Sequence, residues 1–207
     1  MDSGNIGFVL LCAAFVFVMT PGLAMFYGGL VRKKNVVNTM MTSIFIIGIG
    51  IVMWVLFGYS LSFAPSGNAF IGDFRWLGLE GVSLTEGYTD DASIPNMVFS
   101  AFQMMFAVIT PALITGAVAG RMKFKSIFVF TIFWSLIVYY PLAHMVWGQG
   151  GLLGADGIGA LDFAGGDVVH ISSGVSALVL CILLGKRHDY EHSIYRIHNI
   201  PTVVLGA

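Results

Sequence analysis

The sequence predicts an all-α membrane protein that crosses the bilayer several times. Of its 207 residues, 57% are hydrophobic and only 10% are charged, and the mean hydropathy is +0.87. Soluble domains carry about 25% charged residues. The apolar residues also gather in runs long enough for a helix to cross a bilayer, which takes about 20 residues. These observations exclude a disordered chain, a nucleic-acid-binding protein and an ordinary cytosolic enzyme.

Five apolar runs predict five transmembrane helices. The runs are residues 6–31, 36–63, 94–119, 124–147 and 165–184. The fourth tolerates Lys125 near its end, where a lysine side chain can reach the headgroups. A sixth run opens at Ile200 and continues to Ala207, so we expect a sixth helix to start there and the protein to continue beyond it. Residues 1–207 are then expected to form one membrane domain that is incomplete at its C-terminus.

The basic residues predict the orientation of these spans. They follow the first, third and fifth spans: Arg32, Lys33, Lys34; Arg121, Lys123, Lys125; Lys186, Arg187, Arg196. Nine of the ten basic residues therefore lie on one side, and only Arg75 does not. The positive-inside rule makes that side cytoplasmic and places the N-terminus outside. The outer loop at 64–93 carries five acidic residues, which could attract a cation or could simply be tolerated there.

The odd number of spans has a topological consequence. A second five-span unit following this one would cross the membrane in the opposite direction. Such inverted repeats are common in transporters, and the substrate path then lies at the repeat interface.

Two ionisable residues near the start of the fifth span require an explanation, because charges inside a membrane are costly. Asp162 can cap the helix by accepting hydrogen bonds from backbone N–H groups, and this capping could also shape a substrate entrance. If the helix begins near Asp162, His170 lies roughly 12 Å deeper, toward the midplane. A neutral imidazole can donate and accept hydrogen bonds along a narrow path. The alternative for His170 is a core residue bonded to a neighbouring helix.

Three aromatic residues and one further histidine also have two interpretations each. Trp147 is either an interfacial anchor or the cation–π wall of a binding site. Phe102 and Phe106 share a helical face and form either core or a dry constriction that stops hydrated ions. His144 is expected to be structural or interfacial, and a zinc site that combines it with His170 has weak support. No motif indicates a cofactor, a nucleotide loop or a catalytic nucleophile.

Several segments together resemble the ammonium transporter family (Amt/Mep/Rh), in particular its microbial Amt branch. They are residues 20–35, 101–106 followed by Gly116, 143–147 and 162–170, and the last is the most specific. The resemblance covers nearly the whole chain in the family's order. It implies an eleven-helix fold built from two inverted halves plus one helix, of which this chain is the first half and the start of helix six.

The resemblance also implies functional residues. Trp147 and Phe102 would contribute to an outer ammonium-recruitment site, Phe106 to a phenylalanine gate beneath it, and Asp162 to the acidic surroundings. His170 would be the first of two pore histidines. Ammonium would be recruited, deprotonated and conducted as ammonia. Asp167 departs from the family pattern, which favours a small neutral residue, and could modulate His170 or cation recruitment.

The resemblance further implies a homotrimer in the cytoplasmic membrane and a cytoplasmic PII-type signalling partner. Two other functions are considered. One is an ammonium sensor, whose Amt-like membrane domain is coupled to a signalling domain. The other, outside the family, is a metal-containing membrane enzyme that uses His144 and His170.

Overall fold

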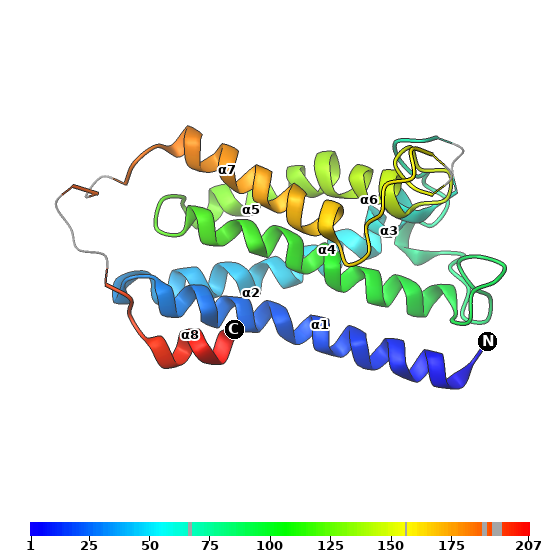
Figure 1. The fold of residues 1–207 in the computed structure, drawn as a ribbon, viewed down its shortest axis with the longest axis horizontal. Coiled ribbons are helices and arrows are strands. Elements are labelled where there is room, and N and C mark those ends of the chain that lie inside the picture. The colour runs from blue at the N-terminus through cyan, green and yellow to red at the C-terminus, as the bar shows by residue number, and fades with distance from the viewer. Residues whose placement is uncertain (66–67, 156, 188–189, 192–195) are drawn as a thin grey trace.

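The computed structural model of the chain is a bundle of long helices joined by loops at both ends (Figure 1). The structure describes residues 1–65, 68–155, 157–187, 190–191 and 196–207, and these residues form helices, turns and loops without a strand. Five helical segments are long and apolar enough to cross a membrane: Ser3–Leu30, Lys33–Phe63, Asn96–Val118, Phe124–Trp147 and Gly166–Leu184. The predicted spans are confirmed, with every boundary within three residues.

Two of the spans are single α-helices and the other three contain a π-helical turn. Helices α1 (Ser3–Leu30) and α4 (Asn96–Val118) run unbroken through Pro21 and Pro111, where the sequence favours kinks. The second span consists of η1 (Lys33–Asn35), α2 (Val36–Met53), η2 (Trp54–Gly58) and α3 (Tyr59–Phe63). The fourth is α5 (Phe124–Trp134), η4 (Ser135–Tyr139) and α6 (Tyr140–Trp147). The fifth is η5 (Gly166–Ile171) and α7 (Ser172–Leu184), and α8 (Ile200–Gly206) follows.

Helix α4 lies at the centre of the bundle. It packs against α1, α2 and α7, while α1 also packs against α2 and α8, and α3 against α6. The apolar stretch of α4 is half buried, whereas that of α1 is only 11% buried. Helix α1 therefore presents a mostly apolar outer face, as a membrane-embedded helix does.

The loops at the two ends of the bundle differ in charge. The N-terminus lies at the same end as the loops that follow α3 and α6 (Figure 1). The α4–α5 turn, the end of α7 and the start of α8 lie at the opposite end, together with nine of the ten basic residues. This arrangement matches the predicted topology, in which the basic end faces the cytoplasm.

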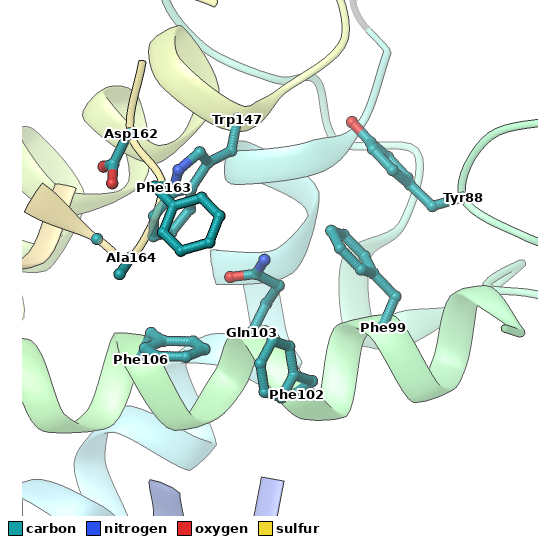
Figure 2. Close-up of a pocket in the computed structure, with 10 residues that line it drawn as sticks. Tyr88, Phe99, Phe102, Gln103, Phe106, Trp147, Asp162, Phe163 and Ala164 are labelled. Carbon is teal, nitrogen blue, oxygen red and sulfur yellow. The ribbon is translucent and has the colours of Figure 1, made fainter. Parts of the chain in front are cut away.

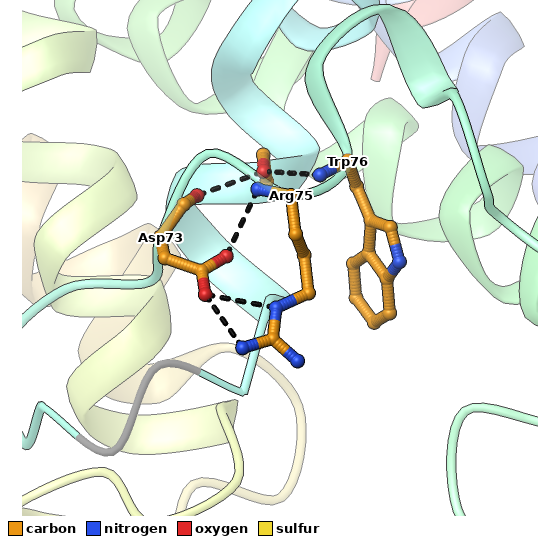
Figure 3. A network of polar contacts seen from close by, with 4 residues as sticks. Asp73, Arg75 and Trp76 are labelled. Atoms are coloured by element: carbon orange, nitrogen blue, oxygen red, sulfur yellow. Dashed lines mark hydrogen bonds and ion pairs between the residues drawn. The ribbon is translucent and has the colours of Figure 1, made fainter.

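A polar network attaches the first outer loop to α3 (Figure 3). Ser60 Oγ donates to the Asp73 carbonyl at 2.8 Å and accepts from the Trp76 N–H at 3.0 Å. Arg75 Nε donates to Asp73 Oδ2 at 2.8 Å, and this side-chain hydrogen bond lowers the pKa of the Asp73 carboxyl. The Trp76 indole stacks on Tyr59 at 5.4 Å and 15°. The loop is thus held on the aromatic end of α3.

Close helix packing depends on glycines at the contacts, because small residues let helices approach each other. A Cβ at Gly116 of α4 would lie 2.4 Å from a ring atom of Tyr27 in α1. The Tyr27 hydroxyl donates to the Leu113 carbonyl at 2.9 Å, which fixes the ring against α4. A larger residue at 116 must therefore displace both the ring and this hydrogen bond.

We predict that Gly116→Ala lowers the thermal unfolding midpoint of the full-length protein in detergent, because the added methyl group clashes with Tyr27. Gly48→Ala is the matched control. Gly48 also lies in a membrane helix, but its Cβ would have no neighbour within 4 Å. The better helix propensity of alanine should leave this control unchanged or slightly stabilised. Equal midpoints for the two variants would contradict the close α1–α4 contact.

Candidate functional site

A cavity of about 570 Å³ (Figure 2) lies toward the end of the bundle that holds the N-terminus (Figure 1). Its walls come from the first outer loop, α4, the end of α6 and the segment before η5. The lining residues are Tyr88, Phe99, Phe102, Gln103, Phe106, Trp147, Asp162, Phe163, Ala164 and Gly165. Four of the five predicted site residues, namely Phe102, Phe106, Trp147 and Asp162, therefore meet at one cavity.

Aromatic rings form most of the cavity wall. The Phe102 and Phe106 rings contact edge to face at 5.0 Å and 84°, because residues four apart lie on one helical face. The Phe106 ring in turn lies 6.5 Å from that of Trp147, at 67°. Such a wall offers the π-faces and ring edges to which a cation or a small apolar molecule can bind.

Asp162 caps the start of the fifth span, as the sequence predicts. Its Oδ1 accepts from the Gly166 N–H at 2.7 Å, and its Oδ2 accepts from the N–H groups of Asp167 and Val168, both at 3.1 Å. Gly165 precedes the helix with a φ of 76°, a left-handed conformation that favours glycine. The carboxylate thus satisfies three of the backbone donors that a helix start leaves unpaired.

Tyr88 and Gln149 connect the two outer loops at the rim of the cavity. The Gln149 N–H donates to the Tyr88 hydroxyl at 3.0 Å, and Gln149 Nε2 donates to the Tyr88 carbonyl at 2.9 Å. The Tyr88 ring stacks on Phe99 at 4.9 Å and 8°. Burial raises the pKa of Tyr88 to about 12, so the phenol stays neutral at physiological pH.

His170 and Asp167 lie apart from this cavity. The helix begins at Gly166 and not near Asp162, because residues 162–165 form the capping loop. Four helical residues therefore precede His170, instead of the eight expected for a helix that begins near Asp162. His170 is exposed on the surface of the described chain, and Asp167 is partly buried. Neither side chain lines the cavity.

The cavity also includes residues that the sequence analysis did not select. Phe99, Phe102, Gln103 and Phe106 follow the spacing i, i+3, i+4, i+7, which defines one face of a helix. This spacing could have identified Phe99 and Gln103. No comparable signal marks Tyr88, Phe163 or Ala164, which reach the cavity through loops.

The structure gives His144 a structural position. Its side chain is fully buried, and its Nδ1 and Nε2 lie 3.1 and 2.8 Å from the carbonyl oxygens of Ser62 and Asn68. One ring nitrogen therefore faces α3 and the other faces the loop that follows it. Within the described ranges, no three His, Cys, Asp or Glu side chains are placed to hold a metal ion.

The fold and the cavity together define a multi-pass helical membrane protein with an aromatic site at one end. The sequence profile of the Ammonium Transporter Family matches residues 7–207. The chain belongs to this family.

Individual relatives agree with this assignment. The chain is 52% identical to an ammonium transporter of Bacillus subtilis and 43% identical to one of Aquifex aeolicus. It is covered completely in both alignments, but spans only 50% and 47% of these relatives. Among solved structures, Saccharomyces cerevisiae Mep2 aligns with a TM-score of 0.86 at 35% identity, over 100% of this chain and 46% of that one. A structure described as a sensor Amt protein aligns with a TM-score of 0.81 at 27% identity, over 98% of this chain and 50% of that one.

We predict that Asp162→Ala lowers the thermal unfolding midpoint of the full-length protein by several degrees. Losing a helix cap costs about 0.5–2 kcal/mol, and here three N–H groups lose their acceptor. Asp91→Ala is the control, because Asp91 is an exposed residue of the other outer loop. A midpoint equal to that of the control would show that the carboxylate does not stabilise the start of the fifth span.

Proposed function

We propose that this protein transports ammonium across the cytoplasmic membrane, with residues 1–207 as part of its membrane domain. The observation that carries the proposal is the aromatic cavity with one carboxylate at its rim, at the predicted outer end of a chain of the Ammonium Transporter Family. The named curated relatives are ammonium transporters, which supports transport over the sensor function. The fold alone does not distinguish a transporter from a sensor, since a sensor Amt protein shares the fold.

In the first step, ammonium binds in the outer cavity. The indole of Trp147 provides the strongest cation–π surface among the aromatic side chains, and Phe102 adds a second ring. Asp162 places a negative charge at the rim, where both of its oxygens accept backbone hydrogen bonds. The acidic outer loop adds to the attraction of cations.

In the second step, the bound ammonium transfers a proton to water at the outer mouth of the cavity, and the neutral ammonia passes the ring of Phe106. Moving an intact cation into a dry pore would cost several kcal/mol or more, because the lost hydration is not replaced. Neutral ammonia avoids most of this cost. The edge-to-face rings of Phe102 and Phe106 offer no oxygen of their own to replace the water around an ion, so passage between them favours the neutral species.

In the third step, ammonia passes His170. A neutral imidazole has one donor and one acceptor nitrogen, which can replace hydrogen bonds that ammonia made to water. Asp167 lies three residues earlier in the same π-helical turn and would modulate this step through its charge.

The proposal includes the assembly and partner that the family resemblance implies. The protein would form a homotrimer in the lipid bilayer, with one pore in each protomer. The basic loops at the predicted cytoplasmic end would face a PII-type signalling protein, although they also serve to orient the spans.

The first test measures the current that ammonium evokes across proteoliposomes containing the full-length protein, with potassium as the control, together with the internal pH. We expect a response to ammonium and none to potassium. Trp147→Leu should raise the half-saturating ammonium concentration roughly three- to thirtyfold, the equivalent of one cation–π contact. Phe133→Leu, which alters an exposed ring on α5, should match the wild type. No response to ammonium in either readout would overturn transport.

The role of His170 has a separate test. We predict that His170→Ala reduces ammonium flux or admits potassium, because the imidazole no longer supplies hydrogen bonds in the path. The same proteoliposomes report both quantities. Unchanged ammonium flux together with unchanged potassium exclusion would remove His170 from the mechanism.

A further inference from the structure

Gln103 has an unusual position in the aromatic cavity. It projects from α4 between Phe102 and Phe106 in the sequence, and Figure 2 shows its amide pointing into the space between Phe99, Trp147 and Phe163. Its Oε1 is buried and has no hydrogen-bond partner among the described residues. Buried polar atoms are nearly always paired in proteins, so an open acceptor in a cavity requires an explanation.

No described neighbour donates a hydrogen bond to the Oε1 of this amide. The cavity wall around Gln103 consists mainly of phenyl and indole rings. Besides Gln103, the lining side chains with polar atoms are those of Tyr88, Trp147 and Asp162, and the Trp147 indole carries only a donor. The Tyr88 hydroxyl is bound to the Gln149 N–H, and both oxygens of Asp162 are bound to backbone N–H groups. Among the side-chain acceptors that the described residues place at the cavity, Gln103 Oε1 is therefore the one that accepts no hydrogen bond.

We propose that Gln103 is a specificity-determining residue, whose Oε1 accepts a hydrogen bond from an N–H group of ammonium bound against the aromatic wall. This inference rests on the proposed function, because it assumes that ammonium occupies the cavity. A hydrogen bond from a charged donor is stronger than one between neutral groups, and it strengthens further where water is excluded.

The same contact favours ammonium over potassium. Cation–π attraction depends mainly on charge, so the aromatic wall alone holds both ions. Ammonium carries directed N–H donors, and a single well-placed oxygen fully satisfies one of them. Potassium needs a shell of several oxygen ligands to replace its water, which one amide in an aromatic cavity does not provide. The aromatic wall thus attracts any cation of suitable size, and the hydrogen bond to Gln103 favours a cation that carries N–H groups.

The test compares Gln103→Met, Gln103→Glu and Met104→Leu with the wild type in proteoliposomes, using ammonium-evoked current and internal pH. Methionine keeps the size of the side chain but removes the acceptor, whereas glutamate keeps an acceptor oxygen. Met104→Leu is a volume-conserving control on the same helix, at a residue outside the cavity lining. The folding of each variant is checked by its thermal midpoint.

We expect Gln103→Met to raise the half-saturating ammonium concentration roughly tenfold, as for one charge-assisted hydrogen bond. Gln103→Glu should bind ammonium at least as tightly as the wild type, because a carboxylate is a stronger acceptor for a cation, and Met104→Leu should not differ from the wild type. Potassium should compete better against ammonium in Gln103→Met than in the wild type.

Two results would overturn the inference while leaving the proposed function intact. One is a wild-type half-saturating concentration in Gln103→Met. The other is equal impairment of Gln103→Met and Gln103→Glu, which would assign Gln103 to packing. If Gln103→Met does not fold, Gln103→Glu alone tests the inference. This variant retains an acceptor oxygen, so a loss of ammonium affinity in its folded form would contradict the inference. A wild-type protein that transports no ammonium would overturn the proposed function first.

Discussion

The cavity depends on the hydrogen bonds that Asp162 accepts at the start of the fifth span. Its carboxylate binds three consecutive backbone N–H groups, from Gly166 to Val168, and so determines where the helix begins. In the membrane, backbone donors at a helix start have little water to bind, which makes such a cap more valuable. The same bonds hold Phe163 and Ala164 at the cavity, opposite α4. One acidic side chain thereby determines both where the fifth span begins and how the cavity is shaped.

The cavity lies in surroundings of low polarity, where a cation loses its water without gaining other ligands. A pocket lined by many polar groups would bind cations of several kinds, whereas a purely aliphatic pocket would bind no cation. Here the rings of Phe106 and Trp147 attract positive charge without offering oxygen ligands, and the Gln103 amide adds a single open acceptor. We propose that this balance binds ammonium strongly enough to collect it, yet leaves the intact ion poorly solvated below the cavity. The neutral molecule then passes more easily.

The fold was largely predictable from the sequence, because hydrophobic length and charge placement are strong signals in membrane proteins. All five spans were found, as was the capping role of Asp162. The helix start near Asp162 that was assumed for the depth of His170 was wrong, because the residue at which a helix begins depends on loop geometry. Phe99 and Gln103 could have been found from their shared helical face. Tyr88 could not, since its position depends on the contact between two outer loops that are distant in sequence.

The central claim is that the aromatic cavity is the ammonium-binding site. The most direct test is a structure of the full-length protein determined with methylammonium, which retains N–H donors and differs from water in having two non-hydrogen atoms. We predict density for methylammonium in the cavity, with its methyl group against the rings and its nitrogen within hydrogen-bonding distance of Gln103 Oε1. An empty cavity at saturating methylammonium, or methylammonium bound elsewhere, would contradict the claim.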